Sequence, residues 1–382
     1  MKRSWAHILL WCGLAVVPLS AISLTKDGYQ VFPGENIQEA LQLAAESQTN
    51  KTVIVHAGEY RPNSKRQALI WFNKMHDGIR LEAEGLVTLT AANAQLAISS
   101  EPGFPSVVNH VVYFGDGISS NTVLKGFRIS GANNFVTKAM TKEMEPDRTI
   151  PKNFFFFADG GAIKIFGRSY PTIQNVEIVD NFTNPCGAGI SVQHQGFNQA
   201  SVLIENCVFL RNRAQVTGAA IDLLAGSAAR VINCLFVGNV SNTGEDTVAK
   251  SSGERPFVNS GVMTIFQNSR ADVRNSTFTG NRNGVDDMGG LSSYANCIFV
   301  DNRLDTGLKG FARYELAVNA GGKVLGCFIN GTVHDVRHVV SAQENVLEAP
   351  TPKFNKSFVP EAPEYKGVGY RPVSSDFAAR NR

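Results

Sequence analysis

A short motif recurs along the middle of the chain at nearly regular spacing. Each copy has a Gly-Ala-Ile-type segment and then a second segment that opens with Asn and closes with another Asn six residues later. The opening residues are Asn175, Asn206, Asn233, Asn275 and Asn296, so successive copies are 31, 27, 42 and 21 residues apart. Self-similarity at a period of about 20–50 residues indicates a solenoid. The shortest spacing predicts one coil, and the longer ones predict a coil plus loops; the spacing of 42 leaves room for a second coil.

Apolar and polar residues alternate within each copy, as in strands that are buried on one side. Because alternate side chains of a strand share a face, a Cys and a Phe fall on the same face of several copies. These pairs are Cys207 with Phe209, Cys234 with Phe236, and Cys297 with Phe299. One coil cannot bury its own apolar face, so we expect coils to stack with Cys over Cys and Phe over Phe inside. The closing Asn lies at a bend and tolerates the left-handed conformation, which predicts a ladder of turn Asn residues.

The Asn-Cys-x-Phe-x-x-Asn segment at residues 206–212 and the Gly-Gly-Ala-Ile segment at residues 160–163 resemble the right-handed parallel β-helix repeat of the pectin-lyase-like superfamily. The resemblance covers roughly residues 35–345 and implies an all-β fold, a single right-handed parallel β-helix or solenoid. It implies less about function, because this fold hosts lyases, glycoside hydrolases, epimerases, esterases, phage tailspikes and adhesins.

The β-helix is expected to occupy residues 24–345. Near its start, Asn36 can cap a short helix. The apolar face of that helix is Ile37, Ala40, Leu41 and Ala44. β-Helix enzymes similarly begin with a helix that plugs the first coil, which implies a capping role here. Residues 346–382 contain five Pro and lose the repeat, so they are expected to cap the last coil or to run back along the outside.

Residues 1–23 have the form of a secretory signal peptide. Lys2 and Arg3 give the positive start, and the apolar stretch at residues 8–17 is too short to span a bilayer. A retained membrane anchor is the alternative. We expect a secreted or periplasmic monomer with no membrane contact after cleavage. Removing two positive charges from the formal net charge of +3 leaves about +1, which argues against nucleic acid as a partner.

Five Cys residues remain after cleavage, and four of them share one position in the repeat. The four are Cys207, Cys234, Cys297 and Cys327, and the fifth is Cys186. Side chains on flat parallel strands rarely have disulfide geometry, so we interpret them as small buried thiols. The chain has no paired Cys-x-x-Cys spacing, which argues against a metal site built from Cys.

Long insertions at residues 132–159 and 240–260 follow the same corner of the repeat. Insertions on a solenoid gather on one face, often the binding face, so we expect a wall of loops beside the next strand. Copies of that strand align one outward row: Lys164, Ser191, Asp222 and Thr264. The flanking positions are Phe166, Gln193, Leu224 and Phe266. The first insertion ends in four Phe, residues 154–157, which either pack on the coil or form an aromatic platform for sugar rings.

The row and its flanks have the composition of a sugar-binding groove, a few polar groups among apolar and aromatic ones. The predicted substrate-binding residues are Ser191, Gln193, Thr264, Phe166 and Phe266. For β-elimination of a uronic acid polymer, a base must remove a proton while cations neutralise the carboxylate. The predicted catalytic residues are Lys164 and Arg168, with His194 as a second base and Asp222 beside them.

Hydrolysis would instead use two carboxylates, which Asp222 could provide together with Asp286 or Asp287. Asp286 and Asp287 are also the candidate calcium ligands, although calcium requires more oxygen ligands than these supply. The motif sets of polygalacturonase-like hydrolases and of pectate lyases are not found in the chain.

We predict that the protein binds an extracellular, acidic polysaccharide. Whether it also cleaves the polymer stays open at this point, with lyase-type β-elimination favoured if it does. The first alternative is a non-catalytic carbohydrate-binding or surface-structural solenoid, and the second is a glycoside hydrolase. A tight cluster of ionisable residues under the wall loops would favour an enzyme. Solvated, separated Lys164 and Asp222 side chains would favour binding alone.

Overall fold

The computed structural model describes residues 22–133, 149–243, 260–304, 314–319, 321–330, 333–334 and 344–373. Nearly all of the predicted signal peptide therefore lies outside the described residues, as do the central parts of both long insertions. No helix in the described ranges is long and apolar enough to cross a membrane.

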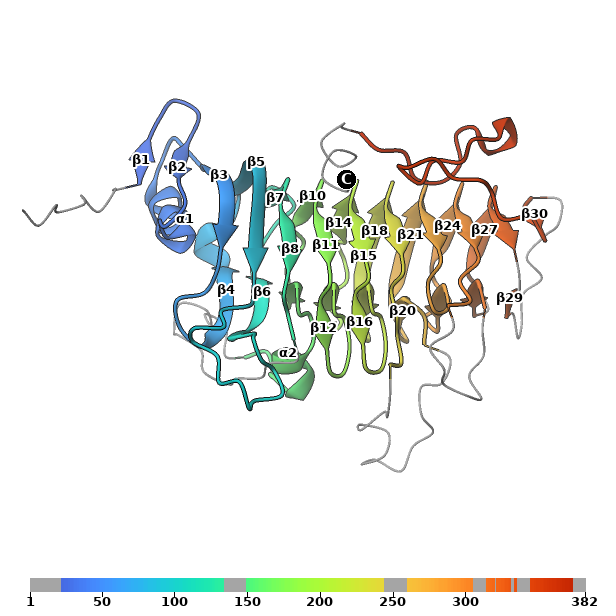
Figure 1. Ribbon diagram of the computed structural model, residues 1–382, viewed down its shortest axis with the longest axis horizontal. Coiled ribbons are helices and arrows are strands. Elements are labelled where there is room, and N and C mark those ends of the chain that lie inside the picture. Colours follow the sequence, from blue (N-terminus) through green and yellow to red (C-terminus); the bar gives the residue numbers. More distant parts are fainter. Residues whose placement is uncertain are drawn as a thin grey trace, which may run out of the picture.

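Coils of short strands stack along the long axis of the molecule, each strand pairing in parallel with its equivalent in the next coil (Figure 1). In the described part of the chain, one sheet has nine strands. They are β4 (Arg66–Phe72), β6 (Val108–Phe114), β9 (Ile163–Phe166), β13 (Ile190–Gln193), β17 (Ile221–Leu223), β20 (Met263–Ile265), β23 (Val285–Asp287), β26 (Leu316–Val318) and β29 (Val333–His334). This arrangement confirms the predicted all-β, right-handed parallel β-helix.

A second sheet contains 19 of the described strands and contributes two from each central coil. They are β1 (Ser23–Leu24), β2 (Tyr29–Val31), β3 (Thr52–Tyr60), β5 (Arg80–Thr90), β7 (Val123–Lys125), β8 (Arg128–Ser130), β10 (Thr172–Gln174), β11 (Glu177–Val179), β14 (Val202–Glu205), β15 (Val208–Leu210), β18 (Ala228–Ile232), β19 (Leu235–Val237), β21 (Arg270–Arg274), β22 (Thr277–Thr279), β24 (Ser293–Ala295), β25 (Ile298–Val300), β27 (Lys323–Leu325), β28 (Phe328–Asn330) and β30 (Val346–Leu347). A two-stranded sheet joins β12 (Phe182–Thr183) to β16 (Arg213–Ala214). Because β19 pairs directly with β22, the spacing of 42 residues hides no second coil.

The inside of the solenoid is a stack of like side chains, as predicted. Ring centroids of Phe209 and Phe236 are 4.8 Å apart, those of Phe236 and Phe278 are 4.2 Å apart, and those of Phe278 and Phe299 are 4.9 Å apart. All three pairs are stacked nearly parallel. The five Cys residues of the described chain are buried and free, which confirms the prediction of buried thiols. Stacking gives each coil a buried apolar face that it cannot have alone.

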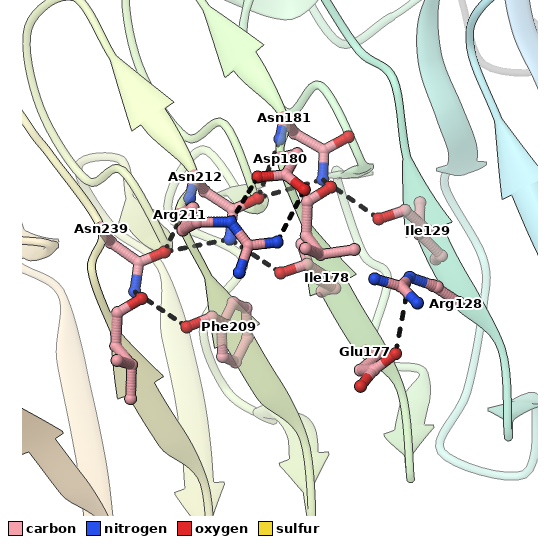
Figure 2. A network of polar contacts seen from close by, with 12 residues as sticks. Arg128, Ile129, Glu177, Ile178, Asp180, Asn181, Phe209, Arg211, Asn212 and Asn239 are labelled. Atoms are coloured by element: carbon pink, nitrogen blue, oxygen red, sulfur yellow. Dashed lines mark hydrogen bonds and ion pairs between the residues drawn. The ribbon is translucent and has the colours of Figure 1, made fainter. Parts of the chain in front are cut away.

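The closing Asn residues form a buried hydrogen-bonded ladder (Figure 2). Its members are Asn181, Asn212, Asn239, Asn281 and Asn302. Each Nδ2 donates to the Oδ1 of the next Asn at 2.7–3.0 Å, and the last donates to Glu315. The prediction that the closing Asn itself adopts the left-handed conformation is wrong. Positive φ falls on the opening Asn, as at Asn175, and on the residue before the closing Asn, as at Asp180.

Two 3₁₀ turns and two helices complete the described secondary structure, at Lys74–His76, Pro363–Tyr365, α1 (Ile37–Glu46) and α2 (Phe154–Ala158). The α1 helix lies at one end of the solenoid (Figure 1). Asn36 caps it by accepting a hydrogen bond from the Gln38 backbone N–H, and the predicted apolar face is buried. Gln38 then ties the helix to β4 through hydrogen bonds with the Trp71 backbone. These contacts confirm the predicted capping helix.

After β30, which pairs with β28, residues 348–373 run back along the outside of the 19-stranded sheet (Figure 1). Tyr365 packs against the late strand β25, whereas the Tyr370 backbone N–H donates to Thr277 Oγ1 at 2.9 Å. The backbone N–H of Arg371 reaches further back, to Asn233 Oδ1 at 2.7 Å. Of the two courses considered for this Pro-rich segment, the described part therefore follows the outside course.

Candidate functional site

The predicted row of outward residues exists with the predicted register. Lys164 pairs with Ser191, Ser191 with Asp222, and Asp222 with Thr264 across successive strands of the nine-stranded sheet. Asp286 continues the row, because Thr264 pairs with it in β23. Alternate positions of a parallel strand keep the same face from coil to coil, so sequence alignment was enough to place these side chains together.

The row is not the open floor of a groove, and this part of the prediction is wrong. Lys164, Ser191, Asp222 and Thr264 are all completely buried. A turn lies directly over three of them, and each turn has a Gly with positive φ four residues before the row residue. A Cβ added at Gly160, Gly187 or Gly218 would lie 3.1, 2.7 or 2.6 Å from the Cβ of Lys164, Ser191 or Asp222, respectively. Only a backbone without side chains can cover the row so closely.

Beneath these turns lies a compact cluster of ionisable groups: Asp159, Lys164, Cys186 and Asp222. Oxygen atoms of the two carboxyls and the Cys186 Sγ lie within 4.8 Å of one another, and all three residues are buried. Asp159 Oδ1 accepts from the Cys186 backbone N–H at 3.2 Å, and Asp222 Oδ1 accepts from Thr217 Oγ1 at 3.0 Å. Lys164 Nζ donates to Ser191 Oγ at 3.1 Å and to the Phe155 carbonyl at 3.0 Å.

Burial controls the protonation of this cluster. It lowers the pKa of Lys164 to about 8, against the attraction of Asp159 and Asp222. It raises the pKa of Asp222 to about 7, and that of Asp159 well above its usual value. Burial also raises the pKa of the Cys186 thiol, with both carboxylates adding to the effect. Several strongly shifted pKa values in one place are typical of functional sites, although buried structural networks also produce them.

A cavity of about 500 Å³ lies beside the cluster, between the wall loops and the ends of the strands. Its described lining is Pro151, Asn153, Phe155, Pro185, Cys186, Gln193, Gln195, Val216, Thr217, Leu224, Ala225 and Phe266. Cys186 and Thr217 belong to both the cavity and the cluster, so they separate the cavity from the two carboxyls. The wall loops and the flanking residues Gln193, Leu224 and Phe266 thus form a pocket. The predicted catalytic residues Lys164 and Asp222 lie behind it.

The substrate-binding predictions divide between the cavity and the interior. Gln193 and Phe266 line the cavity. Phe166 does not, because it is buried against Phe156 with ring centroids 4.6 Å apart. Ser191 is covered and accepts the Lys164 hydrogen bond, and Thr264 is held by the turn at Gly261. Of the five predicted substrate-binding residues, Gln193 and Phe266 can therefore contact a ligand in this cavity.

The four consecutive Phe form the short helix α2 rather than a strand. Phe156 is buried against Tyr113 and Phe166, whereas Phe154 is half exposed. Phe155 faces the cavity. Both interpretations of this segment therefore apply, each to a different residue: one ring packs on the coil and another offers an aromatic surface to the pocket.

Arg168 and His194 lie outside the cluster. Arg168 forms an ion pair with Asp116 at 2.6 Å and is half exposed. His194 is buried, with Nε2 against the Ser169 carbonyl at 2.9 Å and Nδ1 accepting from the Ala228 N–H at 3.3 Å. Burial lowers its pKa to about 4, so the ring is neutral at pH 7. With both nitrogens bonded to backbone, His194 has none left to take a substrate proton.

Asp286 and Asp287 face opposite sides of β23, as adjacent residues in a strand must. Asp287 points inward, where it accepts from Tyr294 OH at 3.1 Å and from the backbone N–H groups of Gly289 and Gly290. Asp286 stays in the outward row, where partial burial and the charges of Asp287 and Asp222 raise its pKa to about 7. This geometry argues against the predicted calcium site, because the two carboxylates do not face one ion.

Sequence reasoning missed Asp159 and Cys186 as members of the site. Asp159 directly follows α2, in the insertion, and Cys186 lies in the short loop between β12 and β13. One signal was available: of the five Cys among the described residues, Cys186 is the one that does not share the repeat position. Because Cys186 does not belong to the internal Cys stack, its presence needs another reason. Its burial beside Asp159 supplies that reason.

Residues 109–259 match the family model described as a right handed beta helix region. Comparison with curated proteins gave no significant match, and comparison with solved structures gave none either. Together with the stacked parallel coils, the family match shows the right-handed parallel β-helix fold that the resemblance in the sequence predicted. A β-helix domain indicates a carbohydrate-related or surface solenoid protein and selects no particular reaction.

Proposed function

We propose that the protein binds a carbohydrate chain in the cavity between its wall loops and the nine-stranded sheet. The observation that carries this proposal is the lining, which combines aromatic faces at Phe155 and Phe266 with the amides of Asn153, Gln193 and Gln195. Ring faces pack against the apolar faces of sugars, and amides pair with hydroxyls. A volume of about 500 Å³ falls within the usual range for small-ligand sites.

An uncharged sugar fits this lining better than a uronic acid. Among the described lining residues none is Lys or Arg, and the buried cluster behind Cys186 and Thr217 holds two carboxyls and one Lys. A uronate carboxylate placed here would lose water without gaining a cation, which is unfavourable. The proposal therefore departs from the acidic polymer expected from sequence and keeps its polysaccharide class.

Affinity electrophoresis and calorimetry against a panel of neutral and acidic polysaccharides test this proposal. We expect retention by a neutral polymer, with at least about tenfold weaker binding for Phe266→Ala, since one buried aromatic contact contributes on the order of 1.5 kcal/mol or more. Gln193→Ala should weaken binding by a smaller factor. Gln199→Ala, an exposed change outside the cavity lining, is the matched control.

Binding to acidic polymers alone would contradict the uncharged-sugar proposal. Equal binding by wild type and Phe266→Ala would place the ligand elsewhere on the solenoid. Absence of binding to every polymer would leave the surface-structural alternative, in which the stacked coils themselves are the function.

Cleavage is the second candidate, favoured by the ionisable cluster. The Asp159 and Asp222 carboxyls are close enough for the paired-carboxylate arrangement of glycoside hydrolysis, and Lys164, with its pKa lowered to about 8, is the candidate base for β-elimination. Both mechanisms require movement of the turns at Gly160 and Gly218, because these turns cover Lys164 and Asp222, which are completely buried. Ultraviolet absorbance of an unsaturated product reports elimination, and a reducing-sugar assay reports hydrolysis. Loss of either signal in Lys164→Ala or Asp222→Ala would assign the cluster.

The proposed setting is outside the cytoplasm. The signal-like sequence at residues 1–23 supports export to the periplasm or the medium, where polysaccharides are met. N-terminal sequencing of the mature protein checks this, since a chain that retains Met1 would contradict cleavage.

A further inference from the structure

The cluster behind the cavity has the donor atoms of a metal site. A carboxylate oxygen of Asp159, the Sγ of Cys186 and a carboxylate oxygen of Asp222 all lie within 4.8 Å of one another. Asp159 and Cys186 come from the successive wall loops that precede β9 and β13, and Asp222 lies on β17 in the next coil. Stacked coils thus bring together side chains that are 27 and 36 positions apart in the sequence.

Two atoms of this cluster lack partners that their burial would normally require. Asp159 Oδ2 and Asp222 Oδ2 are buried and have no hydrogen-bond partner among the described residues, whereas the other oxygen of each carboxyl is bonded. A buried oxygen without a hydrogen-bond partner is unfavourable, and more so when it is charged. Unsatisfied oxygens on two neighbouring carboxyls indicate that something between them is still to be bound.

The one neighbouring cation does not satisfy these oxygens. Lys164 Nζ directs its hydrogen bonds to the Phe155 carbonyl and Ser191 Oγ, and no ion pair joins it to either Asp in the described structure. With both carboxylates and the Cys186 thiolate ionised, the cluster would carry three negative charges and one positive charge. A divalent cation would make the group neutral, which is the condition that a buried cluster favours.

We propose that Asp159, Cys186 and Asp222 bind a divalent transition metal, with Zn²⁺ as the best match. Two oxygens and one thiolate suit this borderline-soft ion, whereas Ca²⁺ requires about 6–8 oxygen ligands. Zinc bonds of roughly 2.0–2.3 Å require the ligand atoms to approach one another by about 1 Å from their widest separation. This proposal does not depend on what the cavity binds.

Three protein ligands leave the fourth position of a four-coordinate metal to a non-protein ligand. Cys186 lines the cavity while Asp159 and Asp222 lie behind it, so a metal held by the three would lie directly behind the cavity wall. Three protein ligands with an open fourth position are the arrangement of reactive rather than structural zinc sites. The absence of a Cys-x-x-Cys pair, which argued against metal in the sequence, excludes the usual structural sites and leaves this kind.

Metal binding to the full chain can be tested directly after treatment with a chelator. Titration with Zn²⁺ in a calorimeter should give one site per chain, and titration with Co²⁺ should give the near-ultraviolet absorption of a cobalt–thiolate bond. Because burial raises the pKa values of all three ligands, binding at pH 7 should release protons, and the heat should depend on the buffer.

Cys186→Ala should abolish the cobalt–thiolate absorption and weaken zinc binding at least about tenfold, and Asp222→Asn should weaken it similarly. Cys207→Ala removes a buried thiol of the internal stack and is the matched control. It should bind the metal as wild type does. Thermal unfolding of each metal-free variant establishes that it is folded. Absence of zinc and cobalt binding by folded wild type, or unchanged binding by folded Cys186→Ala, would overturn the proposal.

Discussion

Two buried rows of stacked side chains follow the same coils but differ in composition and in how their polar atoms are satisfied. At one corner the closing Asn residues repeat from coil to coil and satisfy one another, each amide donating to the next (Figure 2). On the nine-stranded sheet, a Lys, a Ser, an Asp and a Thr follow in successive coils. That row is buried under glycine turns, and one oxygen of Asp222 is left without a hydrogen bond.

The difference shows how a solenoid separates stability from function. An amide has both a donor and an acceptor, so identical amides one coil apart, ~4.8 Å, complete each other indefinitely. Ionised carboxylates have only acceptors, so a buried row that contains them needs an external partner. A row of identical residues therefore identifies structure in a β-helix, and a buried row of unlike ionisable residues identifies a candidate site. Substitutions in the two rows should have opposite effects on stability.

The largest expected effect is in the ladder, for Asn239→Leu. This change removes the acceptor of Asn212 Nδ2 and of the Asn212 backbone N–H, and the donor to the Phe209 carbonyl. Each buried group left unsatisfied costs roughly 1–3 kcal/mol, so the free energy of unfolding should fall by about 4 kcal/mol. Urea denaturation followed by circular dichroism measures it.

Asn198→Ala is the control for Asn239→Leu. Its amide also donates one hydrogen bond, to the Asn268 carbonyl, but at the surface. We expect a change within about 0.5 kcal/mol. A loss below 1 kcal/mol for Asn239→Leu would mean that the ladder is not what stabilises this corner.

The second largest loss of stability is expected for Gly218→Ala, in the turn that covers Asp222. Gly218 has a φ of +56°, and an added Cβ would lie 2.6 Å from the Asp222 Cβ. Left-handed backbone costs a non-Gly residue about 1 kcal/mol, and the overlap adds about 2 kcal/mol, giving a loss of about 3 kcal/mol.

Gly196→Ala separates these two contributions. Gly196 has a φ of +89° but nothing within 4 Å of its added Cβ, so its loss should be only about 1 kcal/mol. Equal losses for the two variants, measured by urea denaturation, would show that the turn at Gly218 can move away from the row. That result would favour access of a ligand to Asp222.

The coils could be predicted because they repeat. Strands that pair in parallel keep equal positions aligned, so the register of Lys164, Ser191 and Asp222 followed from aligning copies of the sequence. The Phe stack and the Asn ladder followed for the same reason. The capping helix could be predicted from local chemistry alone, since the Asn36 cap and an apolar stripe specify it.

The site could be predicted only in part, because period-two alternation separates two faces without saying what covers the outer one. The turns at Gly160, Gly187 and Gly218 bury the row, and alternation within the strands gives no information about these turns. Asp159 and Cys186 directly precede two of these Gly residues, at a position whose side chain changes from coil to coil and is Thr217 before Gly218. A regular signal did exist: Gly lies four residues before each of Lys164, Ser191 and Asp222.

In metal-free protein, Asp222→Asn is expected to raise the free energy of unfolding, whereas the ladder substitution Asn239→Leu lowers it. Burial raises the pKa of Asp222 to about 7, so the folded chain keeps this proton to higher pH than the unfolded chain. The contribution of the carboxyl to stability is therefore complete below about pH 4 and is lost as the pH rises toward 7. Asn does not titrate and can still accept the Thr217 hydrogen bond.

At pH 8, Asp222→Asn should be more stable than wild type by about 2 kcal/mol, while the two should differ little at pH 4. Urea denaturation at pH 4, 6 and 8 with a chelator present measures this difference. A variant that is less stable than wild type at pH 8 would place Asp222 with the ladder, as a structural residue.

The smallest perturbation compares one residue type in the two regions. Cys207, Cys234, Cys297 and Cys327 are completely buried in the internal stack, whereas Cys186 is 4% exposed and lines the cavity. Iodoacetamide should therefore alkylate Cys186 before any of the four thiols of the internal stack. Its rate at pH 8 should be more than about tenfold below that of a free thiol, because burial and the carboxylates of Asp159 and Asp222 raise its pKa.

Peptide mapping by mass spectrometry after timed quenching follows each thiol separately. The alkylation rate of Cys186 should rise with pH and should be faster in Asp222→Asn, where one of the negative charges that oppose thiolate formation is gone. The thiols of the internal stack should react only after denaturation, whatever the pH. If one of them reacts as fast as Cys186 in the folded chain, the coils open at least as readily as the wall loops. That result would contradict the division between a stable stack and an accessible site.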